Sequence, residues 1–358
     1  MDKNKELERI ARLSNAYGIS GFEDDVTAIL RKEAEGLGAV NEDAMRNVYI
    51  ERKENTGGKP VLMLDAHSDE VGFMVKAIRP DGMLEFTTIG GWVVYNIPAH
   101  LVHVLNSEGK YIPGVVASKP PHFMTPEERK APLELSQLVI DVGSVSMEEV
   151  TESFKIEIGA PVVPDASFYY NEENGVMRGK AFDNRLGSAA VLSVLEGLQG
   201  LDLAVDVVGA IASQEEVGTR GAVVTAQRVK PDVCLVFEGC PADDTVLPAY
   251  QAQTVLKKGP MLRHIDARMI TSPRFLRFAL ETAKKNGIKH QRAVRTGGST
   301  NGAPIHVEGK AVPSVVIGMP VRYAHTSYCY SSYEDYENGV RLGTAVAKGL
   351  TKEVIESF

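Results

Sequence analysis

Five residues that can bind a divalent metal ion each follow an apolar run of this chain, either directly or within a few residues. They are His67, Asp183, Glu216, Glu238 and His325. Unbroken apolar runs are typical of strands that are buried on both faces, as in the parallel sheets of α/β domains. In an open α/β sheet the ligand site lies beyond the carboxyl ends of the strands. We therefore expect these side chains to gather along one edge of a sheet.

Two imidazoles and three carboxylates are donors that suit Zn²⁺, Co²⁺ or Mn²⁺ better than a thiolate site would. If one carboxylate is shared between two cations, each cation also receives a histidine and a carboxylate of its own. The charges agree with this arrangement, because three carboxylates and one bridging hydroxide balance two dications. A pair of cations can polarise a carbonyl group and acidify a water molecule. The residue set therefore predicts hydrolysis of an acyl bond.

Two further carboxylates lie beside these candidate ligands. Asp69 is two residues from His67, so on an extended segment both side chains point the same way, and Asp69 could accept the second N–H of the imidazole. Glu215 precedes Glu216, and neighbouring residues that leave a strand point in different directions. One glutamate can then bind metal while the other acts as a general base.

Composition excludes several classes of function. The chain has 358 residues and a formal net charge of −8, which argues against nucleic-acid or anionic-membrane binding. No stretch reaches the roughly 18 apolar residues that a membrane span needs, and the start has no signal core, so we expect a cytoplasmic protein. The three cysteines form no pattern of pairs, and Cys234 lies inside an apolar run, as a small core residue would.

The chain divides into an outer pair of α/β segments and a middle of different character. Residues 1–70 and 163–358 are predicted to form one discontinuous catalytic domain with a mixed, mostly parallel sheet flanked by helices. Residues 71–162 are predicted to be an inserted small all-β domain, because short strands surround the turns 80–82 and 106–109. The pieces 138–140 and 156–158 close this region.

Helical spacing is present in several parts of the α/β segments. The expected helices span 3–17, 23–38, 183–198, 273–286 and 333–355. In the inserted region, Phe73, Phe86, Trp92 and Tyr95 are expected to be exposed and to form a contact between subunits.

Four runs, 65–72, 180–185, 214–218 and 322–325, closely resemble those of the glutamyl-aminopeptidase family of co-catalytic metallopeptidases, metallopeptidase family 42, which includes the tetrahedral aminopeptidases. The resemblance covers nearly the whole chain, including the loop 119–122 of the inserted region. It implies a two-metal aminopeptidase that acts on short peptides and assembles from dimers into a dodecamer. By position, the family's metal ligands match His67, Asp183 (bridging), Glu216, Glu238 and His325, its general base Glu215, and its histidine-orienting acid Asp69.

The chain departs from the family pattern at two places. A Gly-Gly-Thr-Asp-Ala run is replaced by the run 297–302, so that Asn301 could stand where the family has an acid near the substrate. Many members have Asp where this chain has Glu238, and Asp243 and Asp244 are rival ligands nearby. Both departures bear on substrate preference more than on the reaction. His122 and His306 lie in loops that could approach the substrate.

Two other functions stay open from the sequence. A metal-independent glycosidase could use Glu215 and Glu238 as acid and base, but it leaves His67, Asp183 and His325 unused. A catalytically inactive scaffold of the same fold would be expected to have lost at least one ligand, whereas here all of them are present together with Glu215.

Overall fold

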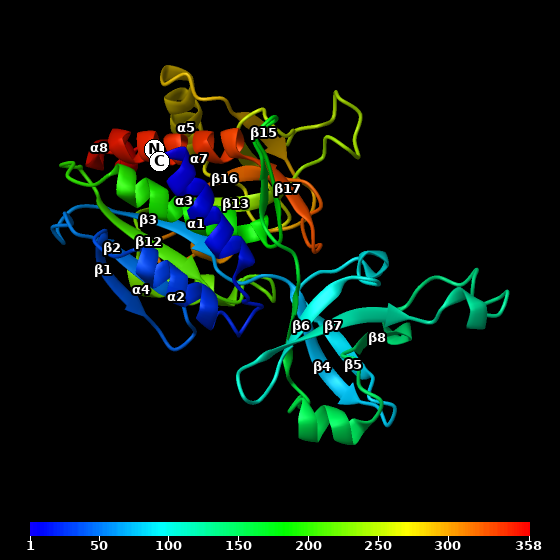
Figure 1. The fold of residues 1–358 in the computed structure, drawn as a ribbon. Coiled ribbons are helices and arrows are strands. Elements are labelled where there is room, and N and C mark those ends of the chain that lie inside the picture. Colours follow the sequence, from blue (N-terminus) through cyan, green and yellow to red (C-terminus); the bar gives the residue numbers. More distant parts are fainter.

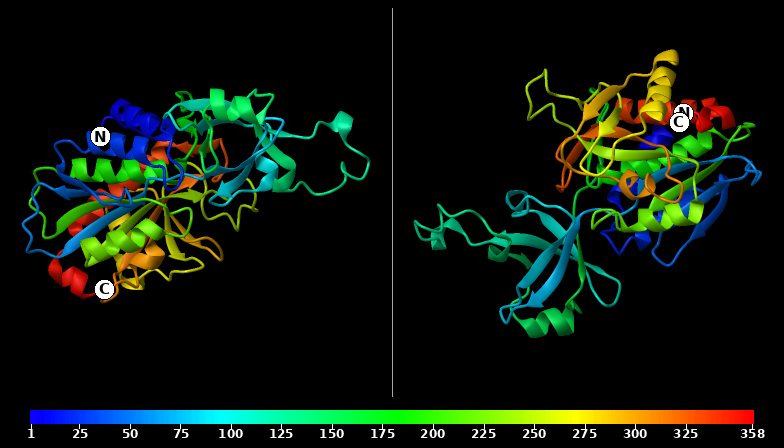
Figure 2. Two further views of the ribbon diagram at one scale, coloured as in Figure 1. Left: turned by 90° about the horizontal axis from the view of Figure 1, so that it is seen from below. Right: turned by 180° about the vertical axis from the view of Figure 1, so that it is seen from behind.

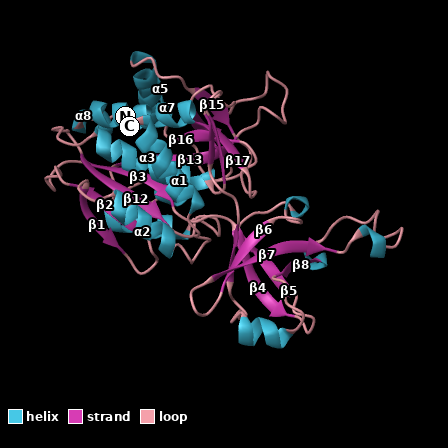
Figure 3. Ribbon diagram, in the orientation of Figure 1, coloured by secondary structure: helices cyan, strands magenta, loops and turns pink.

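The computed structural model describes all 358 residues, and an eight-stranded mixed sheet forms its largest layer (Figures 1 and 3). The four central strands β12, β3, β13 and β16 run parallel, and the strands β2 and β14 that flank them are antiparallel to their inner neighbours. From one edge to the other the strands are β1 (Gly38–Glu42), β2 (Val48–Arg52), β12 (Asp206–Ala212), β3 (Val61–His67), β13 (Val233–Pro241), β16 (Ser314–Val321), β14 (Met261–Ile265) and β15 (Gln291–Val294). This mixed, mostly parallel sheet is the predicted one.

Helices cover both faces of this sheet (Figure 2). Side chains alternate between the faces along each strand, so that in β3 Leu62 and Leu64 join one apolar core while Met63 joins the other. Five helices pack on the larger core: α1 (Lys3–Asn15), α2 (Asp24–Glu33), α3 (Phe182–Gly197), α5 (Pro273–Lys285) and α7 (Tyr333–Gly349). Helices α4 (Arg220–Val229) and α6 (Gly302–Ile305) contribute to the smaller one. No helix combines the length and apolar character that crossing a membrane requires.

A closed antiparallel barrel lies beside the sheet layer (Figure 1). Its strands are β4 (Gly72–Ile78), β5 (Leu84–Ile89), β6 (Leu101–Leu105), β7 (Tyr111–Ser118), β8 (Leu138–Asp141) and β9 (Pro161–Pro164). The segment between β7 and β8 extends away from the barrel as an arm (Figure 2). A third small sheet combines β10 (Tyr169–Asn171), β11 (Val176–Gly179) and β17 (Cys329–Ser332).

Three boundaries differ from the sequence prediction. The segment 156–158 is irregular, and β9 closes the barrel instead. The predicted helix 23–38 ends at Glu33, because Gly38 already pairs with Arg52 in the edge strand β1. The last helix is broken: α7 ends at Gly349, and Thr351 caps a separate helix α8 (Lys352–Glu356) by accepting the N–H of Val354.

The predicted contact surface in the inserted region is wrong for three of its four residues. Phe73 and Phe86 belong to the core of the barrel, and Trp92 is half-buried and stacks on Phe73 with ring centroids 4.7 Å apart. Only Tyr95 is exposed. Side chains alternate between the inside and the outside of a barrel along each strand, and the inward ones fill its interior. Phe73 of β4 and Phe86 of β5 are inward-facing.

Candidate metal centre

The predicted ligands converge at the carboxyl ends of the parallel strands. His67 is the last residue of β3, and Ala212, its partner in the neighbouring strand β12, is followed after a short turn by Glu216. Val236 of β13 pairs with Asp65 of β3, so Glu238 lies beside His67 on the same face of the sheet. Asp183 comes from the start of α3, and His325 comes from the loop after β16.

Two groups of side chains share Asp183. In the first group, Nε2 of His67 lies 3.2 Å from Oδ1 of Asp183 and 3.3 Å from Oε1 of Glu238. In the second, Nε2 of His325 lies 3.5 Å from Oδ2 of Asp183 and 3.2 Å from Oε2 of Glu216. The two oxygens of one carboxylate therefore face two different imidazoles.

The geometry and the donor chemistry both fit a pair of divalent cations. Two ligand atoms at about 2.1 Å from one tetrahedral ion are about 3.4 Å apart, which agrees with the separations within each group. Oε1 of Glu216 and Oε2 of Glu238 are buried and have no hydrogen-bond partner, and such oxygens need a cation or a donor.

The electrostatics of the cluster point the same way. Burial, and then the charge of Asp183, raises the pKa of Glu238 to about 8, although His67 acts in the opposite direction. Burial opposes the charge on His325, but Asp183 and Glu216 outweigh it and raise the pKa of this imidazole to about 11. These buried carboxylates therefore favour the binding of a positively charged group among them.

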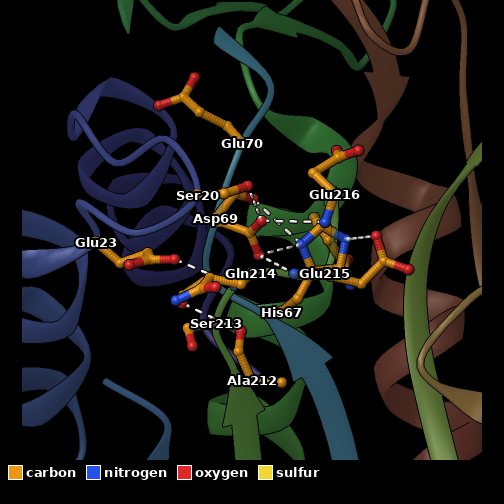
Figure 4. A network of polar contacts seen from close by, with 12 residues as sticks. Ser20, Glu23, His67, Asp69, Glu70, Ala212, Ser213, Gln214, Glu215 and Glu216 are labelled. Carbon is orange, nitrogen blue, oxygen red and sulfur yellow. Dashed lines mark hydrogen bonds and ion pairs between the residues drawn. The ribbon is translucent and has the colours of Figure 1, made fainter. Parts of the chain in front are cut away.

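Asp69 does more than face His67, and Figure 4 shows it at the centre of a polar network. Its Oδ1 lies 3.3 Å from Nδ1 of His67, and it also accepts the backbone N–H groups of Glu215, at 2.9 Å, and Glu216, at 3.1 Å. Ser20 donates its hydroxyl to Oδ2 at 2.5 Å. Burial opposes ionisation, but the contacts with His67, Ser20 and the N–H of Glu215 lower the pKa of Asp69. The carboxylate of Asp69 thus fixes the position of His67, at the end of β3, relative to the turn that contains Glu215 and Glu216, called here the Glu-Glu turn.

Comparison with known proteins identifies the family. The family model described as M42 glutamyl aminopeptidase matches residues 47–342. The chain belongs to this family. It is accordingly a hydrolase that acts on peptide bonds, as its named relatives are.

The matches with individual relatives cover nearly the whole of this chain. A TET aminopeptidase from a marine sediment thaumarchaeon has 36% identity and a TM-score of 0.95, with 99% of both chains covered. The glutamyl aminopeptidase of Lactococcus lactis is 29% identical, and the match covers 98% of this chain and 98% of that protein. The lysyl aminopeptidase of Pyrococcus furiosus is 28% identical, and the match covers 96% of this chain and 97% of that protein. These two names state different substrates, so membership of the M42 family does not by itself determine the preferred residue.

A fourth relative concerns assembly. The TET1 peptidase of Pyrococcus horikoshii can assemble into a tetrahedron or a large octahedral shell. Its sequence is 26% identical to this one, and its structure matches with a TM-score of 0.86. The match covers 96% of this chain and 100% of that one.

Glu23 is a buried residue of this M42 site that the sequence did not reveal. Its Oε1 accepts the backbone N–H groups of Gly21, at 2.8 Å, and Gln214, at 3.1 Å. Gln214 has a φ of 52°, a left-handed conformation that costs a non-glycine residue about 1–3 kcal/mol. Glu23 therefore holds a strained residue directly before Glu215. No local pattern marks it, because it acts on a turn that is distant in sequence.

The barrel also approaches the candidate ligands, through the loop Gly90-Gly91, which the sequence did not single out. A methyl group on Gly91 would lie 3.2 Å from Nδ1 of His325, and one on Gly90 would lie 3.3 Å from Cβ of Glu216. Nδ1 of His100 lies 3.4 Å from the hydroxyl of Ser327, in the loop that carries His325.

Other residues considered from the sequence lie away from the cluster. Asp243 accepts N–H groups of Gln253 and Thr254, and Asp244 pairs with Arg322 at 2.7 Å, so neither competes with Glu238. Asn301 is buried and donates to the carbonyl of Ala66 rather than lining the site cavity.

The remaining histidines and the cysteines are also outside the cluster. His122 is exposed on the arm, and His306 contacts carbonyls of its own helix. The cysteines Cys234, Cys240 and Cys329 are all buried and free.

The first prediction concerns Glu23, whose pKa is raised to about 7 by burial and by the nearby charge of Asp69. The folded protein then retains a proton that the unfolded chain releases above pH ~4.5, so stability falls as the pH rises between about 4.5 and 7. Glu23→Gln keeps the accepting oxygen and removes the charge. The variant should therefore gain roughly 1–3 kcal/mol relative to the native protein at pH 8, and little at pH 4.5.

The measurement is the thermal midpoint of both proteins at pH 4.5 and pH 8, at one protein concentration. The gain should reach a few degrees at pH 8 only. Glu35→Gln, which changes an exposed glutamate just after α2, is the control and should show no such difference. An equal effect at both pH values would contradict the assignment.

Proposed function

We propose that this M42 enzyme removes the N-terminal residue from short peptides with two divalent cations, Zn²⁺, Co²⁺ or Mn²⁺. His67 and Glu238 would hold one cation, Glu216 and His325 the other, and Asp183 would bridge them. The observation that carries the proposal is that the two oxygens of Asp183 face His67 and His325 separately.

Bound at this cluster, the cations would supply Lewis acidity to a peptide carbonyl and lower the pKa of a water molecule. Glu215 is placed to handle the proton. Its Oε2 lies 3.9 Å from Nε2 of His67, beside both ligand groups, and burial raises its pKa well above the ordinary value. Glu215 would take the proton of the attacking water and deliver it to the nitrogen of the leaving amine.

Asp69 is a positioning residue in this scheme. Because it accepts the N–H groups of both Glu215 and Glu216, it sets the base and a ligand in a fixed relation to His67. A metal-independent glycosidase would need none of this, since it requires two carboxylates and no imidazole. The complete set of donors likewise argues against an inactive scaffold.

Assembly is the second part of the proposal. We infer that residues 1–70 and 163–358 act as the catalytic domain, that residues 71–162 act as an inserted domain, and that dimers assemble into a dodecamer in the cytoplasm. The shells formed by the relative from Pyrococcus horikoshii support a large homo-oligomer. The barrel region exposes Val93, Tyr95, Leu101 and Phe123, apolar side chains suited to contacts between subunits.

The second prediction separates the two adjacent glutamates. Glu216→Gln should weaken metal binding, and excess metal should partly restore activity. Glu215→Gln should retain both cations while kcat falls on the order of 10²–10⁴-fold, and excess metal should not restore it. Elemental analysis and steady-state kinetics of both variants test this. If Glu215→Gln loses metal and Glu216→Gln retains it, the two roles are reversed.

The third prediction concerns metal and the peptide end. Chelation should abolish hydrolysis, and Zn²⁺, Co²⁺ or Mn²⁺ should restore it, because the ligands bind as one converged set.

Acetylating the amino terminus of a peptide should remove nearly all turnover by the metal-loaded enzyme. Mass spectrometry of the products provides the measurement, and internal cleavage of the blocked peptide would indicate an endopeptidase instead.

A further inference from the structure

Asp183 lies at the start of α3, on a stretch that does not have helical geometry. Asp183 has a φ of −89° and a ψ of 102°, and Asn184 has a φ of −129° and a ψ of 42°. Residues of an α-helix have a ψ of about −42°. The regular hydrogen bonds of the helix therefore do not set the direction of the Asp183 side chain, so this direction depends on contacts with other segments.

Asn184 provides such contacts with β13. Its Nδ2 donates to the carbonyl oxygen of Phe237 at 2.8 Å, and its Oδ1 accepts the N–H of Gly239 at 3.1 Å. Phe237 and Gly239 are the two neighbours of Glu238 along this strand. The side chain of Asn184 is fully buried, and Oδ1 also accepts the N–H of Gly187 at 3.0 Å. The carboxamide of Asn184 therefore holds β13 on both sides of Glu238.

This carboxamide lies where the pairing of two strands ends. β3 pairs with β13 only as far as Asp65 and Val236, whereas β16 pairs with β13 as far as Pro241. A side-chain amide has both a donor and an acceptor, as a peptide group does. Asn184 therefore satisfies backbone groups of β13 beyond the last residue that β3 pairs with.

The backbones of α3 and β13 also approach each other closely at Gly239. A methyl group on Gly239 would lie 2.4 Å from the carbonyl oxygen of Phe182 and 2.7 Å from Cα of Asp183. Any side chain here would push Asp183 away from the strand, and glycine avoids this because it has no Cβ. Asp183 and Glu238 are therefore joined by a direct backbone contact and by the hydrogen bonds of Asn184.

We propose that Asn184 is a positioning residue that fixes Asp183 relative to Glu238, and so shapes the place where these two carboxylates and His67 would hold one cation. The inference rests on the two-metal function proposed above. The hydrogen bonds of Asn184 reach neither the Glu-Glu turn nor the loop that carries His325. Asn184 therefore acts mainly on the cation beside His67 and less on the cation beside His325.

The test measures the affinity of each cation for the full chain. Native protein and variants are titrated with Co²⁺ or Zn²⁺ against a competing chelator, and bound metal is counted by elemental analysis. In Asn184→Ala one dissociation constant should rise about 10–100-fold, the usual effect of losing a contact that orients a ligand, and the other should change less than about threefold. Asn184→Asp keeps the acceptor for Gly239 but, when ionised, has no donor for Phe237, so its effect should be smaller.

Asn106 offers a matched control in the barrel. It is also buried, donates to the carbonyl of Phe154 at 2.9 Å and accepts the N–H groups of Glu108 and Lys110. Asn106→Ala removes the same number of hydrogen bonds at a distance from the cluster. It should lower the thermal midpoint and leave both dissociation constants unchanged.

Two double variants assign the effect to one cation. Glu238→Gln already removes a ligand of the cation beside His67, so adding Asn184→Ala should not change the dissociation constant of the remaining cation. Glu216→Gln removes a ligand of the other cation. Adding Asn184→Ala to this variant should weaken the cation that remains.

Several outcomes would overturn the proposal. One is an equal rise of both dissociation constants in Asn184→Ala, and another is the same change in Asn106→Ala, since either would indicate a general loss of structure. Unchanged binding in Asn184→Ala would do so too. If this variant does not fold, unchanged binding in Asn184→Asp overturns the proposal. If the native protein binds no cation, the two-metal function proposed above fails instead.

Discussion

The shared carboxylate of Asp183 is the interaction on which the site depends. It places one oxygen near His67 and the other near His325, although His67 is the last residue of β3 and His325 lies in the loop after β16. Each imidazole also meets a second carboxylate, from Glu238 or Glu216. A buried group of this kind is stable only if its charges are offset. The parallel strands make it feasible because their carboxyl ends bring these side chains to one edge.

The surrounding structure holds this group in place through backbone contacts. Asp69 accepts two N–H groups of the Glu-Glu turn, and Glu23 accepts the N–H of the residue before it. Gln214 and His325 both have positive φ values, so the segments that bring in Glu216 and His325 are strained. Strain of this kind persists only where neighbouring structure fixes the chain. The Gly90-Gly91 loop of the barrel lies against His325 and Glu216, so the barrel forms part of the surroundings of the candidate ligands.

The sequence was sufficient for the parts of the structure that follow from local patterns. Apolar runs predicted the central strands and the candidate ligands at their ends, and turn residues predicted the hairpins β4–β5 and β6–β7. The four family motifs contain four of the five candidate ligands, and Glu238 was placed by the apolar run before it. It was insufficient where distant segments decide the outcome. Phe73 and Phe86 were expected on the surface because no local signal shows which face of a barrel strand points inward. Glu23 and Gly91 were missed because their partners, Gln214 and His325, are far away in the chain.

Metal content of the Asp183→Asn variant tests the central claim most directly. An asparagine keeps the size of the side chain but offers one neutral oxygen, so it cannot bridge two cations. After reconstitution with Co²⁺ or Zn²⁺ and removal of free metal, the native protein should retain two ions per chain by elemental analysis. The variant should retain fewer than one, with its fold intact by circular dichroism. Retention of both ions by Asp183→Asn would contradict the account.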